Sequence, residues 1–260
     1  MRWPLAFLMV GASVASLSIA WAQEQVSARI QALPEPTAPP DEPRPSITRR
    51  LLREEARIWS FPVHAHQHGS AVLAVTSGTI GLVALDPHVA PYFGRPEFDR
   101  FKSGFLTKRP MAAMIVAIPA ATYAAGLLTH RNYFRGTGEL ALEAAAHGFI
   151  VSTALKAITG RRFPVQIPGD GNFRDTWFKY SGPAQDPGSF PSTHATSAFA
   201  VAAVYSSRYK HKRWVPITAY GLAALASFSR ITDQTHFPSD VFVGAAVGYA
   251  IGHFVVAVPH

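Results

Sequence analysis

Apolar segments separated by short polar breaks occupy the chain from residue 71 onward, and they predict helices. Six such segments are present: Ala71–Leu85, Met111–Thr129, Leu140–Ile158, Ala195–Ser207, Val215–Phe228 and Val241–Val258. The longer ones approach the ~20 apolar residues that a bilayer span requires, whereas several fall short. All are rich in small residues, which permit close helix packing. We therefore expect an all-α bundle of about five to six core helices, either embedded in a membrane or forming a largely buried soluble bundle.

The first residues predict an export signal. Arg2 precedes an apolar run from Leu5 to Ile19, and Ala20-Trp21-Ala22 offers a cleavage site of the small-x-small type. The alternative is an uncleaved anchor. We therefore expect a signal peptide at residues 1–22.

The next segment, residues 23–60, predicts a linker and a surface helix. Residues 23–45 are rich in proline. Ser46 can cap a helix over Ile47–Trp59 whose basic face suits either an anionic lipid surface or the surface of the main domain. The helical-bundle domain is then expected over residues 61–260.

A short histidine tract precedes the first apolar segment. His64, His66 and His68 would share one face of a strand and could bind a metal there. No carboxylate lies beside them, so a polar loop is the better interpretation. We expect no metal site and no cofactor.

Composition narrows the class of partner. Charged residues make up 15% of the chain, against roughly 25% in soluble proteins, which favours a membrane. The net charge of +8 favours anionic partners such as phosphorylated substrates or lipid head groups. No nucleic-acid-binding motif is present. The chain has no cysteine, which excludes disulfides, thiol chemistry and cysteine-ligated metals.

Basic turns predict the topology. The turn at residues 208–213 is strongly basic, and Arg131 and Arg135 mark an earlier basic turn. Such turns remain in the cytoplasm. The polar breaks described below then lie outside, with five spans if the signal is cleaved and Ala71–Leu85 does not cross, or six with an uncleaved cytoplasmic N-terminus. The expected location is the bacterial inner membrane with the site facing the periplasm; a soluble periplasmic protein is the alternative.

The last polar break carries residues suited to phosphoryl chemistry. His236 and Asp240 are spaced i, i+4, and Pro238 suits a first helical turn, so both side chains can share one face. An aspartate that binds one imidazole nitrogen leaves the other free to attack phosphorus. Arg230 lies just upstream and can neutralise phosphate charge.

Two earlier breaks add to this set. Ser192 stands where a helix would begin, so backbone N–H groups there can bind an anion, and His194 follows in the first turn as a candidate proton donor. Lys156, Arg161 and Arg162 end an earlier segment and can clamp a phosphoryl group, although such cations also flank membrane helices.

One further ionisable pair lies inside an apolar segment. Glu143 and His147 are spaced i, i+4 within Leu140–Ile158. Ionisable groups within a membrane are functional candidates by default. A hydrogen-bonded structural pair is the better interpretation here.

These three breaks resemble the signature of the type 2 phosphatidic acid phosphatase and vanadium haloperoxidase superfamily, over about residues 110–258. The last motif matches in full, at Ser229, Arg230, His236 and Asp240. The middle motif matches at Pro191, Ser192 and His194, with Thr193 where glycine is usual. The first matches at Lys156 and Pro164, with Arg161 as an additional arginine seen in some members, but Phe163 stands where the family has arginine.

The resemblance implies roles for these residues. His236 would form a phosphohistidine, Asp240 would orient it, and His194 would act as general acid and then as base. The phosphoryl oxygens would be held by Lys156, Arg161, Ser192, the Thr193 amide and Arg230. Arg162 could replace the arginine missing at Phe163 if it turned inward. Family phosphatases require no metal.

The resulting prediction is a metal-independent phosphatase at one end of the bundle, acting on a lipid phosphate or pyrophosphate. Its expected partners are the membrane and a phospholipid or polyprenyl phosphate, and family candidates are undecaprenyl pyrophosphate, phosphatidylglycerophosphate, phosphatidic acid and lipid A phosphates. Three alternatives remain open: a soluble acid phosphatase, a vanadate-dependent haloperoxidase with His236 ligating vanadium, and a non-catalytic phosphate- or lipid-binding protein.

Overall fold

The structure is a computed structural model that describes residues 52, 55–60, 69–95, 108–169, 171–179 and 188–258. All of them belong to one compact unit, residues 41–260. The expected signal peptide, the proline-rich linker and the histidine tract lie outside the described residues. Of the expected helix over Ile47–Trp59, residues 55–59 are seen to be helical.

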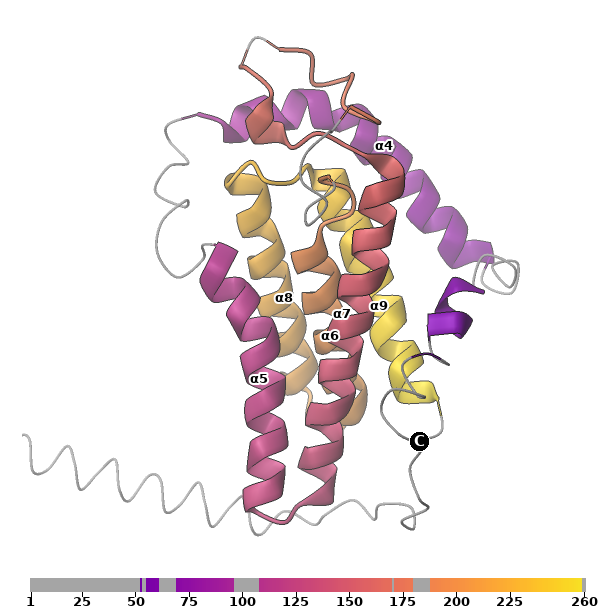
Figure 1. The fold of residues 1–260 in the computed structure, drawn as a ribbon, viewed down its shortest axis with the longest axis vertical. Coiled ribbons are helices and arrows are strands. Elements are labelled where there is room, and N and C mark those ends of the chain that lie inside the picture. The colour runs from indigo at the N-terminus through magenta and orange to yellow at the C-terminus, as the bar shows by residue number, and fades with distance from the viewer. Residues whose placement is uncertain are drawn as a thin grey trace, which may run out of the picture. The chain divides into compact units, whose positions relative to one another are not determined.

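The described residues form helices and no strand, which confirms the all-α prediction. Helices α5 to α9 run side by side (Figure 1). The elements are α4 (Gly69–Phe93), α5 (Lys108–Leu128), α6 (Asn132–Thr159), the short 3-10 helix η4 (Pro164–Gln166), α7 (Thr193–Arg208), α8 (Trp214–Thr232) and α9 (Pro238–Ala257).

Helix α4 extends beyond the apolar segment that predicts it. The segment ends at Leu85, where Asp86, Pro87 and His88 interrupt the apolar run, yet the helix continues to Phe93. Asp86 is fully buried and its carboxylate is bonded by other parts of the chain, so a polar residue is accommodated within the helix. Pro87 and Pro91 both lie inside it.

Helix α7 is the centre of the bundle and packs against α6, α8 and α9. Its closest neighbour is α9, because Gly248 and Gly252 face the α7 backbone. A Cβ atom at these positions would overlap the carbonyl oxygens of Thr196 and Ala200. The two helices therefore meet backbone to backbone, and their N-terminal ends are joined by a hydrogen bond from the Ser192 N–H to the Asp240 carbonyl, at 3.0 Å.

Within the described parts of the chain, four helices are long and apolar enough to cross a membrane. They are α4, α5, α9 and α6, the last counted through to Gln166. Large apolar side chains lie exposed on the outer helices, for example Ile80 on α4 and Ile217 on α8. An apolar exterior of this kind suits hydrocarbon rather than water, as a membrane-embedded bundle requires.

The basic turns lie at one end of the bundle. The turn between α5 and α6 meets the turn between α7 and α8, where the Tyr133 hydroxyl donates to the Arg208 carbonyl and Arg208 Nε donates to the Thr137 hydroxyl at 3.2 Å. The opposite ends of these helices carry the three polar motifs.

Candidate functional site

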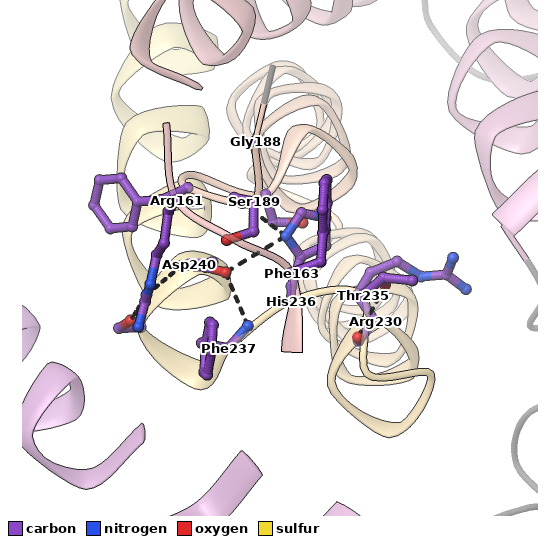
Figure 2. A network of polar contacts seen from close by, with 12 residues as sticks. Arg161, Phe163, Gly188, Ser189, Arg230, Thr235, His236, Phe237 and Asp240 are labelled. Carbon is purple, nitrogen blue, oxygen red and sulfur yellow. Dashed lines mark hydrogen bonds and ion pairs between the residues drawn. The ribbon is translucent and has the colours of Figure 1, made fainter. Parts of the chain in front are cut away.

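The three polar motifs converge at one end of the bundle. The C-terminal ends of α6 and α8 and the N-terminal ends of α7 and α9 meet there, and Figure 2 shows Asp240 lying between Arg161 and the His236 ring. Residues from four separate helix ends thus form one polar cluster.

His236 lies in the loop between α8 and α9 and is 5% exposed. Its Nδ1 lies 2.8 Å from the Ser189 carbonyl oxygen and 3.7 Å from Asp240 Oδ2. Only the first distance is a hydrogen bond. A carbonyl can only accept, so in the neutral ring Nδ1 carries the proton and Nε2 carries the lone pair. The expectation that Asp240 alone selects the tautomer is therefore incomplete, because the Ser189 carbonyl makes the shorter contact.

Electrostatics favour the neutral form of this ring. Burial lowers the pKa of the His236 imidazole below its ordinary value of 6.5, and the Lys156 ammonium acts in the same direction. Asp240 and the Ser189 carbonyl oppose this lowering of the pKa. The Nε2 lone pair is thus available in mildly acidic solution.

Asp240 is held rigidly in the first turn of α9. The Phe237 N–H donates to Oδ2 at 2.8 Å, and Arg161 donates to Oδ1 at 2.5 Å. Pro238 is the first residue of the helix, where its missing N–H leaves no intrahelical bond unmade. Asp240 lies in the first turn and caps the helix by accepting the N–H of Phe237, the N-cap residue. The whole residue is buried.

The Arg161 guanidinium donates hydrogen bonds to four side-chain acceptors of the protein. Nε donates to the Thr176 hydroxyl at 3.2 Å, and Nη1 donates to the Ser239 hydroxyl at 2.7 Å as well as to Asp240. Nη2 donates to Asp86 Oδ2 at 2.7 Å. The side chain is 1% exposed. Arg161 therefore binds and orients two carboxylates in this structure.

Asp86 is the residue that the sequence analysis missed. It reaches the cluster from α4, where Oδ1 accepts from the Ser239 N–H at 3.2 Å and Oδ2 accepts from the Ser239 hydroxyl and from Arg161. It was overlooked because Asp86-Pro87-His88 resembles the end of an apolar segment. A carboxylate inside a longer apolar helix would have been the signal.

Lys156 and Phe163 line the other side of the imidazole. Lys156 Nζ donates to the Gly188 carbonyl at 2.6 Å and lies 5.4 Å from the centre of the Phe163 ring. That ring meets the His236 ring edge-on, with centroids 6.0 Å apart. An aromatic ring thus contacts both the lysine and the histidine, at the sequence position where the family pattern has arginine.

The N-terminus of α7 forms another side of the polar cluster. Ser192 is the N-cap residue, and its hydroxyl accepts from the Ala195 N–H at 3.4 Å. Thr193 accepts a hydrogen bond from the Ser152 hydroxyl at 3.1 Å, and His194 follows in the first turn, half-buried. The Ser192 N–H bonds to α9, which places this helix end beside Asp240.

The remaining arginines point elsewhere. Arg230 is 1% exposed, and its guanidinium bonds Asp233 at 3.0 Å and the Ser229 hydroxyl at 2.9 Å. Figure 2 shows it turned away from the His236 ring. Arg162 is exposed, so it does not take the place of the arginine missing at Phe163.

The intramembrane pair on α6 makes a contact that its spacing did not predict. His147 is fully buried, and its Nδ1 lies 2.7 Å from Glu55 Oε1. The helical turn at residues 55–59 is thereby held against α6. Among the residues that the structure describes, no group of three or more histidines and carboxylates is arranged to hold a metal.

Comparison with known proteins identifies the class. Residues 139–260 match the model of the PAP2 superfamily. The resemblance to this superfamily that the three motifs predict is therefore confirmed over this part of the chain.

The relatives found include two proteins of Porphyromonas gingivalis. One is named lipid A 1-phosphatase and is 38% identical over 65 residues, which cover 25% of this chain and 15% of that protein. The other is named lipid A 4'-phosphatase and is 31% identical over 107 residues, covering 41% of this chain and 44% of that protein. The matched part thus spans less than half the length of either relative.

A solved structure was also found. It is the crystal structure of a transmembrane PAP2 type phosphatidylglycerolphosphate phosphatase from Bacillus subtilis, with 21% sequence identity and a TM-score of 0.39, covering 79% of this chain and 90% of that chain.

Proposed function

We propose that the protein is a metal-independent phosphatase that hydrolyses a lipid phosphate or pyrophosphate through a phosphohistidine. The observation that carries the proposal is the state of His236. Its Nδ1 is bonded to the Ser189 carbonyl, burial favours the neutral ring, and Nε2 therefore carries the lone pair. Ser192 and His194 stand at the neighbouring helix end, as a phosphoryl-transfer site requires.

The reaction has two displacements. His236 Nε2 forms a bond to phosphorus while the bond to the leaving oxygen breaks, and His194 gives that oxygen a proton. His194 then takes a proton from water, the water oxygen attacks phosphorus, and the bond to Nε2 breaks. Inorganic phosphate leaves and both histidines return to their starting states.

The phosphoryl oxygens would be bound by the α7 N-terminus, through Ser192 and the Thr193 amide, and by Lys156 and Arg230. The helix N-terminus favours an anion. Arg230 would have to turn from Asp233, since it is bonded there now. Arg161 has a different role in the proposal: it fixes Asp240, which in turn stabilises the phosphorylated ring.

The substrate class follows from the surroundings. Helices α4, α6 and α9 are suited to a membrane and contribute residues to the cluster, and both named relatives are phosphatases of lipid A. We favour a lipid phosphate, with lipid A phosphates first among the candidates and polyprenyl pyrophosphates next. The basic turns lie at the opposite end of the bundle, and the positive-inside rule therefore supports a site that faces the periplasm.

Phosphate release by the purified protein in detergent, with EDTA present, tests the proposal. The panel would include lipid A phosphates, phosphatidic acid, a polyprenyl pyrophosphate and a water-soluble phosphomonoester. We expect release from a lipid, loss of release in His236→Ala, and no change in His88→Ala, which removes an exposed histidine of α4.

Other results would identify the alternatives. Preference for the soluble ester without detergent would indicate an acid phosphatase. Halide oxidation with vanadate and peroxide would indicate a haloperoxidase. Folded protein that binds a lipid phosphate but releases none would indicate a binding protein.

A further inference from the structure

Helix α4 contributes a buried carboxylate to the site from outside the segment that matches the family. We propose that Asp86 is a positioning residue for His236, acting through Arg161, Ser239 and Asp240. Its side chain is fully buried and lies 75 residues before Arg161 in the sequence. The kinetic part of this inference rests on the proposed phosphatase activity, whereas the titration described below does not.

The bonds of Asp86 explain why a carboxylate is needed. One oxygen accepts the Ser239 N–H, and the other accepts both the Ser239 hydroxyl and Arg161 Nη2. Three donors thus converge on an acceptor that carries no proton of its own. Asparagine has one acceptor oxygen and would turn an N–H toward a donor. Replacement of Asp86 by asparagine therefore loses at least one of these bonds.

Arg161 transmits this constraint to the imidazole. Its guanidinium contacts Trp177 at 4.4 Å and Phe237 at 3.9 Å, measured from the carbon to each ring centroid, so neighbouring rings restrict it as well. Nη2 binds Asp86 and Nη1 binds Asp240, whose other oxygen is 3.7 Å from His236 Nδ1. Movement at Asp86 is therefore passed to the ring through two ion pairs.

Charge provides a second connection. The cluster has one guanidinium between two carboxylates, which leaves a net negative charge beside the imidazole. Other charged or titratable groups at this end of the neighbouring elements include Lys156 on α6, His194 on α7, Arg230 on α8 and Asp233 directly after α8. Removal of the Asp86 charge lets Arg161 neutralise Asp240 more completely. Protonation of His236 then becomes less favourable, so the pKa of its imidazole falls.

Histidine NMR titration of the full chain in detergent tests the inference without any substrate. With ¹³C-labelled histidine, the His236 signal is assigned by its absence in His236→Ala. We expect its titration to move to lower pH in Asp86→Asn, and to remain close to wild type in Asp86→Glu and in the control His88→Ala. A wild-type titration of His236 in folded Asp86→Asn would overturn the inference, because a residue that merely attaches α4 would leave the imidazole unaffected.

Kinetics supply the second readout. Misplacement by about 1 Å can cost ~100-fold in rate, so we expect kcat to fall by tenfold or more in Asp86→Asn with little change in KM. Ser239→Ala removes the hydroxyl that bonds Asp86 without changing the charge. It should lower kcat while leaving the His236 titration in place.

Two outcomes separate the proposals. If Asp86→Asn does not fold, Ser239→Ala decides, and unchanged kcat in that variant would refute the positioning role. If wild type releases no phosphate while the His236 titration still responds to Asp86→Asn, the proposed activity fails and the link between Asp86 and His236 stands.

Discussion

Phe163 meets His236 edge-on, with ring centroids 6.0 Å apart and planes inclined at 62°. The same ring lies 5.4 Å from Lys156 Nζ. An aromatic side chain thus contacts both groups at the sequence position where the PAP2 pattern has a guanidinium. Because Phe163 is uncharged, Lys156 provides the positive charge in this part of the site. Binding of the phosphoryl group would then rely more heavily on the N–H groups of the α7 N-terminus.

Phe163→Arg should therefore increase kcat/KM for phosphate release. A guanidinium beside Lys156 adds hydrogen bonds to the transition state, and one such donor is worth about a hundred- to a thousandfold in acyl transfer. Repulsion from Lys156 reduces the gain, so we expect about tenfold. Steady-state kinetics check this, with Phe163→Leu as the control that removes the ring without adding charge. An equal gain in both variants would show that the ring merely obstructs the substrate.

Arg161→Gln should strongly destabilise the protein. The change leaves Asp86 and Asp240 buried without their shared cation, and breaking a buried ion pair typically costs about 3–5 kcal/mol. The neighbouring variant Arg162→Gln alters an exposed side chain and should change stability by no more than about 0.5 kcal/mol. Thermal unfolding in detergent measures both, and a similar melting temperature for the two variants would contradict the assigned network.

The pH dependence of activity should reflect the buried imidazole. Burial lowers the pKa of His236 below 6.5, so the proposed nucleophile stays unprotonated in mildly acidic solution. The acid limb of kcat/KM should thus lie below pH 6.5. Lys156→Gln removes a cation that lowers this pKa, so its acid limb should move to higher pH. An acid limb above 6.5 in the wild type would count against His236 as the free base.

The free energy of unfolding should also depend on the protonation of His236, and it should decrease in acid. The unfolded chain binds a proton at the ordinary His236 pKa, whereas the folded chain binds it only at lower pH. The contribution of the neutral ring is complete above pH 6.5 and is lost as the pH falls toward the lowered pKa. The difference in unfolding temperature between wild type and His236→Gln, measured across this range, should shrink or reverse as the solution is acidified.

Gly248→Ala should weaken the contact between α7 and α9. Its Cβ would overlap the Thr196 carbonyl, and overpacking of this kind costs about 1–3 kcal/mol. Gly221→Ala on α8 is the matched control, since no atom lies within 4 Å of the added Cβ. There the lower flexibility of alanine should stabilise the helix by about 0.5–1 kcal/mol. Thermal unfolding should shift in opposite directions for the two variants.

The segment around His236 illustrates what local sequence can predict. Its spacing to Asp240 and the proline between them fix a helix start that holds the carboxylate near the ring, and the structure has this geometry within one turn. The order of apolar segments likewise predicts the helices, because each has a polar break at its ends.

The partners of Arg161 illustrate what local sequence cannot predict. Asp86 lies on another helix, and only the packing of α4 against α9 brings it to the guanidinium. The carbonyl of Ser189 offers no side-chain signal at all, since every residue has a carbonyl. From the sequence, Arg161 is expected to bind phosphate. A cation near such a motif can pair with either of two anions, the substrate or a carboxylate, and spacing along the chain does not distinguish them.

The two ends of the bundle differ in their residues, and the helices separate them by their full length. Arg208 and the basic turns lie at one end, and His236 lies at the other. Charges that take no part in the reaction would thus decide, at the moment the chain enters the bilayer, which compartment receives the inorganic phosphate. Transfer of basic residues from these turns to the opposite loops would redirect the product to the other compartment without altering the residues around His236.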